Sequence, residues 1–143
     1  KGNLTVINDT TATSPDATVA ALARFALYRS STSIILVTGG TDKNLIFDDW
    51  ARAVKKFVKP ENLFLLDGSA TPKMLSALGK KNYFKKNTPQ VFLDLEPLLT
   101  TAVKHAKMTP GRKILLFSPS SASFEKFKNE FDRGEKFNKF FNQ

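Results

Sequence analysis

Apolar residues follow two patterns along the chain: short continuous runs, and longer stretches in which they recur every three or four positions. The short runs predict strands at Leu4–Ile7, Ile34–Val37, Asn62–Leu66, Val91–Leu93 and Lys113–Phe117. These runs are almost wholly apolar, which is typical of strands covered on both faces. A sheet buried between two layers is therefore expected.

The stretches with helical spacing lie between these runs. Val19, Leu22 and Ala26 mark one apolar face of a helix over Pro15–Tyr28, and Phe47, Trp50 and Val54 do so for a helix that Pro60 stops. Further helices are predicted over Thr71–Leu78 with Gly79 as the end, Leu95–Lys107, Ser123–Phe131 and Arg133–Phe141.

Strands and helices thus alternate throughout the chain. This order predicts an α/β fold: a Rossmann-like three-layer domain with a mostly parallel sheet of about five or six strands and helices on both faces. A length of 143 residues suits one domain with one core. The chain has no cysteine and no apolar run of about 20 residues, so we expect a soluble, cytoplasmic protein without a membrane span.

The formal net charge of +9 raises the question of an anionic partner. The lysines are scattered through the predicted helices, with a group at 80–86, and no arginine-rich helix or RNA-binding motif accompanies them. Solvated surface is the favoured interpretation. Attraction of a small anionic ligand comes second, and nucleic-acid binding is disfavoured.

Three polar loops follow predicted strands: 8–13, 38–43 and 118–123. Each begins at the carboxyl end of its strand. Because parallel strands point the same way, the loops should emerge at one edge of the sheet and converge on one ligand. The last of them is dense in serines and leads into a predicted helix that opens at Ser123, an arrangement that favours an anion.

The residue types in these loops suit binding. Asp9 can accept hydrogen bonds from sugar hydroxyls, Thr13 can donate to a carboxylate or phosphate, and Lys43 brings a cation to an anion. Each also has an ordinary structural interpretation: turn chemistry in the first loop, an exposed lysine after a Gly-Gly turn in the second, and helix capping by Ser123 in the third.

The sequence lacks the usual signs of a self-contained enzyme. It has no phosphate-binding loop of the Gly-x-x-x-x-Gly-Lys-Ser/Thr type, no cysteine or histidine cluster for a metal, and no nucleophile beside an evident base. The single histidine, His105, lies within a predicted helix and is expected to be structural or solvated. No catalytic or metal-binding residue is predicted, so the domain should contribute binding groups to a site that another domain completes.

Three motifs in this order carry a resemblance to a known family: Val6-Ile7-Asn8-Asp9-Thr10-Thr11-Ala12-Thr13-Ser14-Pro15-Asp16, Gly39-Gly40-Thr41-Asp42-Lys43, and Leu115-Leu116-Phe117-Ser118-Pro119-Ser120-Ser121-Ala122-Ser123-Phe124 with Arg133-Gly134. Over essentially its whole length the chain resembles the C-terminal domain of the bacterial Mur ligases, in particular the members that add D-glutamate.

The resemblance implies an ATP-dependent, amide-forming ligase of peptidoglycan synthesis. An acyl phosphate forms on UDP-N-acetylmuramoyl-L-alanine, and the amine of D-glutamate attacks it. Residues 1–143 would be the amino-acid-binding lid, inactive alone. The central ATPase domain, which binds most of the ATP and Mg²⁺, and the N-terminal UDP-binding domain would lie outside this chain.

The resemblance also implies roles by position: nucleotide contacts for Asn8 and Asp9, one end of D-glutamate for Thr13 and Lys43, and its other carboxylate for Ser123 with the backbone near Glu130 and Phe131. The chain departs from the family at two points. Thr11 stands where the family usually has a lysine, and Glu130-Phe131-Asp132 reverses the usual order of aromatic and acid.

Two other functions stay open at this stage. One is a Mur-ligase-like domain that serves a different amino acid or precursor. The other, from a different class, is a basic α/β module that binds nucleic acid.

Overall fold

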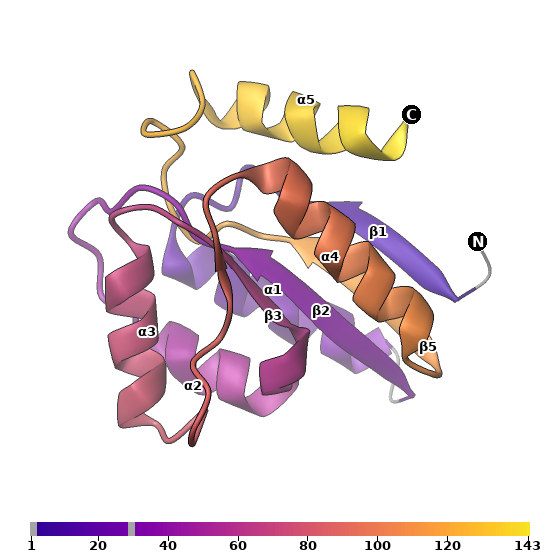
Figure 1. Cartoon of the computed structure of the whole chain (residues 1–143). Coiled ribbons are helices and arrows are strands. Elements are labelled where there is room, and N and C mark those ends of the chain that lie inside the picture. The colour runs from indigo at the N-terminus through magenta and orange to yellow at the C-terminus, as the bar shows by residue number, and fades with distance from the viewer. Residues whose placement is uncertain (1–2, 29–30) are drawn as a thin grey trace.

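The computed structural model describes residues 3–28 and 31–143 and folds them into three layers, a sheet between two layers of helices (Figure 1). The strands are β1 (Leu4–Asn8), β2 (Thr32–Thr38), β3 (Leu63–Leu66), β4 (Val91–Phe92) and β5 (Arg112–Phe117). The helices are α1 (Pro15–Tyr28), α2 (Asp48–Phe57), the short 3-10 helix η1 (Pro60–Asn62), α3 (Thr71–Lys80), α4 (Leu95–Met108) and α5 (Glu130–Phe141). No helix within the described ranges has both the length and the apolar character needed to cross a membrane.

The sheet has the strand order β1-β5-β2-β3-β4, and every pairing between these strands is parallel. The last strand of the sequence, β5, therefore lies between the first two. Leu115 is paired with Val6 on one side and with Ile35 on the other. The predicted fold class, a Rossmann-like α/β domain with helices on both faces, is confirmed.

Successive residues of the buried strands point to opposite faces of the sheet, and each face has its own helices. Ile34 and Leu36 pack with α1, α2 and α3, in a core that includes Trp50 and Met74. Ile35 and Val37 pack on the other face with α4 and α5. Figure 1 shows α4 and α5 on the side of the sheet away from α1, α2 and α3. The apolar runs of the sequence are explained by this burial on both sides.

The prediction of a helix over Ser123–Phe131 is wrong. The carbonyl of Ser123 accepts hydrogen bonds from the N–H groups of Lys126 and Phe127, but this single turn is not continued. Asn129 is extended, with φ −164° and ψ −178°, and its side-chain oxygen accepts a hydrogen bond from the N–H of Asp132. This cap starts α5 at Glu130, so Ser123 is not the N-cap of a helix.

The prediction that Gly79 ends the third helix is also wrong, because α3 continues to Lys80. The chain reverses at Asn82, which has a positive φ of 54°, and the N–H of Tyr83 then returns to the carbonyl of Leu78. Asparagine adopts this left-handed conformation more readily than most other residues. The glycine is therefore not needed for the turn.

The packing of α5 on the sheet can be tested at Phe137. Its ring is 1% exposed and stacks on Phe117 of β5, with 4.6 Å between ring centroids. Replacing Phe137 by alanine should lower the free energy of unfolding by about 3–5 kcal/mol, because it leaves a cavity against the sheet. Urea unfolding of the 143-residue chain measures this. Phe131→Ala on the same helix is the control: Phe131 is 64% exposed, so a similar loss there would contradict this account.

Candidate functional site

The three polar loops meet at one edge of the sheet, as predicted. Because β5 lies between β1 and β2, its loop touches both of the others. The N–H of Ser120 donates to the carbonyl of Ala12 at 2.9 Å, and the N–H of Gly39 donates to the carbonyl of Pro119 at 3.0 Å. Thr41 and Ala122 form an antiparallel bridge with two backbone hydrogen bonds. Backbone hydrogen bonds thus join the three loops into one continuous surface.

Most hydroxyls of the third loop are used inside the protein. The side chains of Ser118, Ser120 and Ser121 are buried. Ser120 Oγ lies 2.9 Å from Thr38 Oγ1 and accepts a hydrogen bond of 2.9 Å from the indole N–H of Trp50. Ser121 Oγ donates to the carbonyl of Pro119 at 3.0 Å. These serines hold the loop in place.

Ser123 is 4% exposed and lines a cavity of about 10 Å³ together with Gly40, Asp67 and Arg133. Such a space holds no more than one water molecule. A Cβ at Gly40 would lie 2.6 Å from Ser121 Oγ, and one at Gly39 would overlap the backbone of Leu66. The two glycines therefore allow the loop to approach the neighbouring loops of the protein closely.

Asp9 and Asn8, the predicted nucleotide contacts, have different surroundings. Asp9 is half-buried and accepts a hydrogen bond of 2.9 Å from Ser118 Oγ. Its burial raises the pKa of the carboxyl, and the bond from Ser118 opposes this in part. The amide of Asn8 donates to the carbonyl of Gly134 at 3.1 Å and to Asn138 Oδ1 at 2.9 Å. Asn8 thus anchors α5, while its nucleotide contact stays a prediction.

The remaining predicted positions lie around the same edge. Thr13 is half-buried at the end of the first loop, and Lys43 is exposed at the end of the second. Glu130 and Phe131 begin α5, where the first N–H groups of a helix have no acceptor within it. Thr10 Oγ1 donates to the carbonyl of Glu130 at 2.7 Å and so ties this helix start to the first loop. The structure thus joins the elements that carry these positions.

Arg133 is a central residue of the candidate site for which the sequence predicted no binding role. Its side chain is 1% exposed, and its guanidinium donates to Thr10 Oγ1 at 3.1 Å, to the Thr10 carbonyl at 2.6 Å and to the Ser121 carbonyl at 3.0 Å. Burial lowers its pKa to about 10. Arg133 therefore connects the first loop, the third loop and α5 through neutral acceptors.

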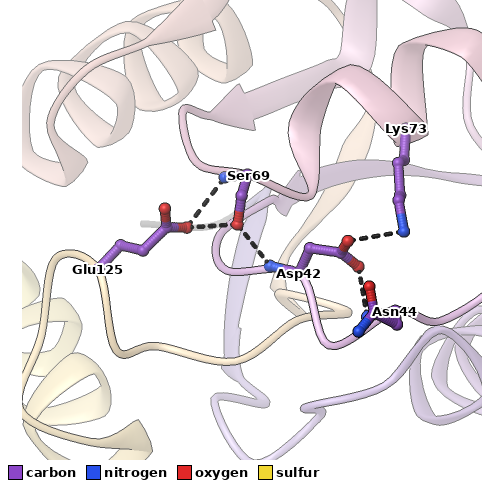
Figure 2. Close-up of polar contacts among 5 residues, drawn as sticks. All are labelled: Asp42, Asn44, Ser69, Lys73 and Glu125. Carbon is purple, nitrogen blue, oxygen red and sulfur yellow. Dashed lines mark hydrogen bonds and ion pairs between the residues drawn. The ribbon is translucent and has the colours of Figure 1, made fainter.

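A fourth loop, 67–70 after β3, also reaches this edge and was missed. Figure 2 shows Ser69 between Glu125 and the backbone of Asp42. Glu125 Oε1 accepts from the Ser69 N–H at 2.9 Å and from Ser69 Oγ at 2.8 Å, and the Asp42 N–H donates to Ser69 Oγ at 2.8 Å. Asp42 also forms an ion pair of 2.6 Å with Lys73. The signal available in the sequence was the polar group Asp67-Gly68-Ser69 directly after a strand.

Within the part of the chain that the structure describes, no group of three or more histidine, cysteine, aspartate or glutamate side chains could hold a metal ion. The ring of His105 lies 5.7 Å from that of Phe64, and its Nε2 lies 2.7 Å from Asn62 Oδ1, which is a structural role. A larger hollow of about 420 Å³ lies between α4 and α5, lined by Lys126, Phe127, Lys136 and other residues. The polar loops themselves enclose no space of ligand size.

The fold and the edge define a class: a Rossmann-like domain that presents hydroxyls, a lysine and helix N–H groups on an open surface. No protein-family model matches the chain. Curated relatives do: it is 43% identical over 136 residues to the UDP-N-acetylmuramoylalanine–D-glutamate ligase of Roseiflexus sp. (strain RS-1), 42% over 139 residues to that of Borreliella afzelii (strain PKo), and 38% over 142 residues to that of Treponema pallidum (strain Nichols).

These alignments cover 92–96% of this chain but only 23–28% of the relatives. The chain thus spans about a quarter of the length of the ligases it matches. It belongs to the Mur ligase family, in the group of the UDP-N-acetylmuramoylalanine–D-glutamate ligases. The extent of the match is consistent with the C-terminal domain of such a ligase.

The buried contacts of Arg133 can be tested by a substitution that keeps the charge. Arg133→Lys should lower the free energy of unfolding by about 1–3 kcal/mol, because a lysine cannot supply the planar set of donors that three acceptors now share. Arg52→Lys is the matched control, since Arg52 has a 67% exposed side chain and pairs with Asp49 on the surface. That change should cost less than about 0.5 kcal/mol. Equal effects in urea unfolding would contradict the role of Arg133.

The acidic groups around Ser69 predict a dependence of stability on pH. The hydrogen bond from Lys73 is the main cause that lowers the pKa of Asp42 below 3.8, and the Ser69 N–H is the main cause that lowers the pKa of Glu125 below 4.5. A carboxyl with a lowered folded-state pKa stabilises the fold above its ordinary pKa and loses that contribution as the pH falls through the folded-state value.

Stability should therefore decline between about pH 5 and about pH 3. Asp42→Asn should show a shallower decline, because it takes up no proton. Glu135→Gln, an exposed change of the same charge, should decline as the wild type does. Urea midpoints over this range measure the slopes, and equal slopes for wild type and Asp42→Asn would refute the assignment.

Proposed function

We propose that the chain is the C-terminal, substrate-binding domain of an ATP-dependent ligase that adds D-glutamate to UDP-N-acetylmuramoyl-L-alanine in the cytoplasm, a step of peptidoglycan synthesis. The observation that carries this proposal is identity of 38–43% over more than nine tenths of the chain with ligases of that name. The polar edge of the sheet supports it, because its groups suit an amino acid with two carboxylates.

D-glutamate carries carboxylates at two separated points and needs a positively charged or N–H and O–H donor at each. In the proposed arrangement, Lys43 and Thr13 bind one carboxylate. Ser123 and a first-turn N–H of α5, from Glu130 or Phe131, bind the other. The helix start favours this, since its free N–H groups and dipole attract negative charge. The reversed order of Glu130 and Phe131 leaves such a backbone donor intact, because every residue except proline has an N–H.

Asp9 and Asn8 lie on the nucleotide side in this proposal. The half-buried carboxylate of Asp9 fits a ribose hydroxyl as a hydrogen-bond acceptor. ATP supplies the phosphoryl group that activates the carboxylate of the alanine. The described residues offer no cluster of metal ligands, so Mg²⁺ and most of the ATP would be held by the central ATPase domain, outside this chain.

The openness of the edge suits a lid. The cavity beside Ser123 measures about 10 Å³, far less than the roughly 300 Å³ or more of a small-molecule pocket. A second surface must therefore close over the ligand. Closure of this domain on the ATPase domain would complete the pocket and exclude water from a hydrolysable acyl phosphate. The 143 residues alone would then be inactive, and they serve as the negative control in an assay.

Substitution of Lys43 and Ser123 tests this function in the full-length ligase. Lys43→Ala and Ser123→Ala should each lower kcat/KM for D-glutamate by about tenfold or more, while the KM for ATP changes less than about twofold, because each removes one donor to a carboxylate. Coupled phosphate release measures both constants. Lys80→Ala, an exposed lysine at the far end of α3, should behave as wild type.

Amino-acid binding by the wild-type, full-length ligase tests the proposed function itself. Calorimetry should detect D-glutamate binding in preference to L-glutamate and neutral D-amino acids. A protein that prefers a different amino acid, or one that binds DNA with a steep salt dependence and no amino acid, would overturn the proposal.

A further inference from the structure

The bonded group around Ser69 links the two loops that carry the candidate contacts of D-glutamate. Lys43 stands between Asp42 and Asn44 in the second loop, and Ser123 precedes Glu125 by two residues in the third. Figure 2 shows that Asp42 and Glu125 approach the same serine from opposite sides. Ser69 is thus a further point, beside the Thr41–Ala122 bridge, at which the loop of Lys43 and the loop of Ser123 are fixed to each other.

The loop that presents Lys43 is held on both sides of the lysine. Before it, the Asp42 N–H donates to Ser69 Oγ at 2.8 Å, and the Asp42 carboxylate pairs with Lys73 at 2.6 Å. After it, the Asn44 N–H donates to Asp42 Oδ1 at 2.9 Å, with Asn44 at a positive φ of 59°. These bonds orient the backbone of Lys43 and leave its side chain exposed for a ligand.

The loop that presents Ser123 is held by Glu125. Its N–H donates to Thr41 Oγ1 at 3.0 Å, and its Oε1 accepts hydrogen bonds from the N–H and the Oγ of Ser69. The backbone from Ser123 to Asn129 belongs to no helix or strand, and one of its few ties to a helix is the bond from the Lys128 N–H to Asp132 of α5. Glu125 therefore supplies a restraint that regular structure would otherwise provide.

From these contacts we propose that Ser69 and Glu125 are positioning residues that, together with the Thr41–Ala122 bridge, set the spacing between Lys43 and Ser123, and so the length of dicarboxylate that the site accepts. This inference rests on the proposed function. Neither residue needs to touch the ligand. Two donors anchored at a set separation distinguish D-glutamate from acids one methylene shorter or longer, because a mismatched acid leaves one carboxylate without a partner.

A general effect on folding can be separated from this role. Ser69 and Glu125 are exposed, and hydrogen bonds at the surface contribute little to global stability. Loss of their bonds should therefore leave the melting temperature of the 143-residue chain within a few degrees of wild type, about as far as other surface changes shift it. A selective change in D-glutamate use would then report the spacing and not the fold.

The experiment compares Ser69→Ala, Glu125→Ala and Glu125→Gln in the full-length ligase. Both alanine variants should raise the KM for D-glutamate by about fivefold to tenfold, with kcat and the KM for ATP within about twofold. They should also narrow the preference for D-glutamate over D-aspartate and D-2-aminoadipate. Glu125→Gln should stay close to wild type, because its amide oxygen still accepts from Ser69. Glu135→Ala, an exposed glutamate on α5, is the control and should match wild type.

The outcomes distinguish this inference from the function on which it rests. A wild-type protein that does not use D-glutamate would overturn both. A wild type that uses it, with alanine variants unchanged in KM and in chain-length preference, would overturn the positioning role alone. Glu125→Gln as impaired as Glu125→Ala would also overturn it, since charge and not the hydrogen bond would then matter.

Discussion

The position of β5 between β1 and β2 is the constraint on which the rest of the structure depends. The strand comes last in the sequence and pairs in parallel with both of the first two. Its loop therefore emerges between theirs and takes up their backbone hydrogen bonds, at Ala12 on one side and at Gly39 and Thr41 on the other. Without this insertion the third loop would lack these bonds to the other two.

The buried polar groups beneath the loops follow from the same constraint. Packing three irregular loops against one another places hydroxyls where water cannot reach, and each buried polar group then needs a partner. Trp50, Ser120 and Thr38 satisfy one another on one face, and Arg133 satisfies carbonyls of the first and third loops at the edge. Lys43, whose side chain remains exposed, is available to a ligand.

This edge of the sheet therefore has a fixed backbone and an incomplete binding pocket. Its backbone is fixed by bonds among four loops and α5, while its enclosed space is about 10 Å³. A preordered surface of this kind loses little conformational entropy when a ligand and a second domain close on it. That combination is suited to a lid, in which the geometry of the binding groups must persist while the domain itself moves.

The sequence by itself determined the fold class and the convergence of the polar loops that form the candidate site. Apolar runs such as Ile34–Val37 and the helical spacing of Val19, Leu22 and Ala26 are local patterns, and both survive in the structure. The presence of polar loops after strands, with Asp9, Lys43 and Ser123 in them, was likewise readable, since parallel strands place such loops at one edge.

Only the tertiary structure decided which polar groups are free and which are used internally. Thr10 and Arg133 are separated by 123 residues, and Ser69 and Glu125 by 56, so no local spacing predicts their bonds. Such bonds also overrode a local preference, because the contacts of Glu125 and the cap of Asn129 replaced the helix that the pattern from Ser123 predicts. The periodicity of apolar residues indicates contacts between residues a few positions apart. The candidate site is instead made by hydrogen bonds between residues far apart in the sequence.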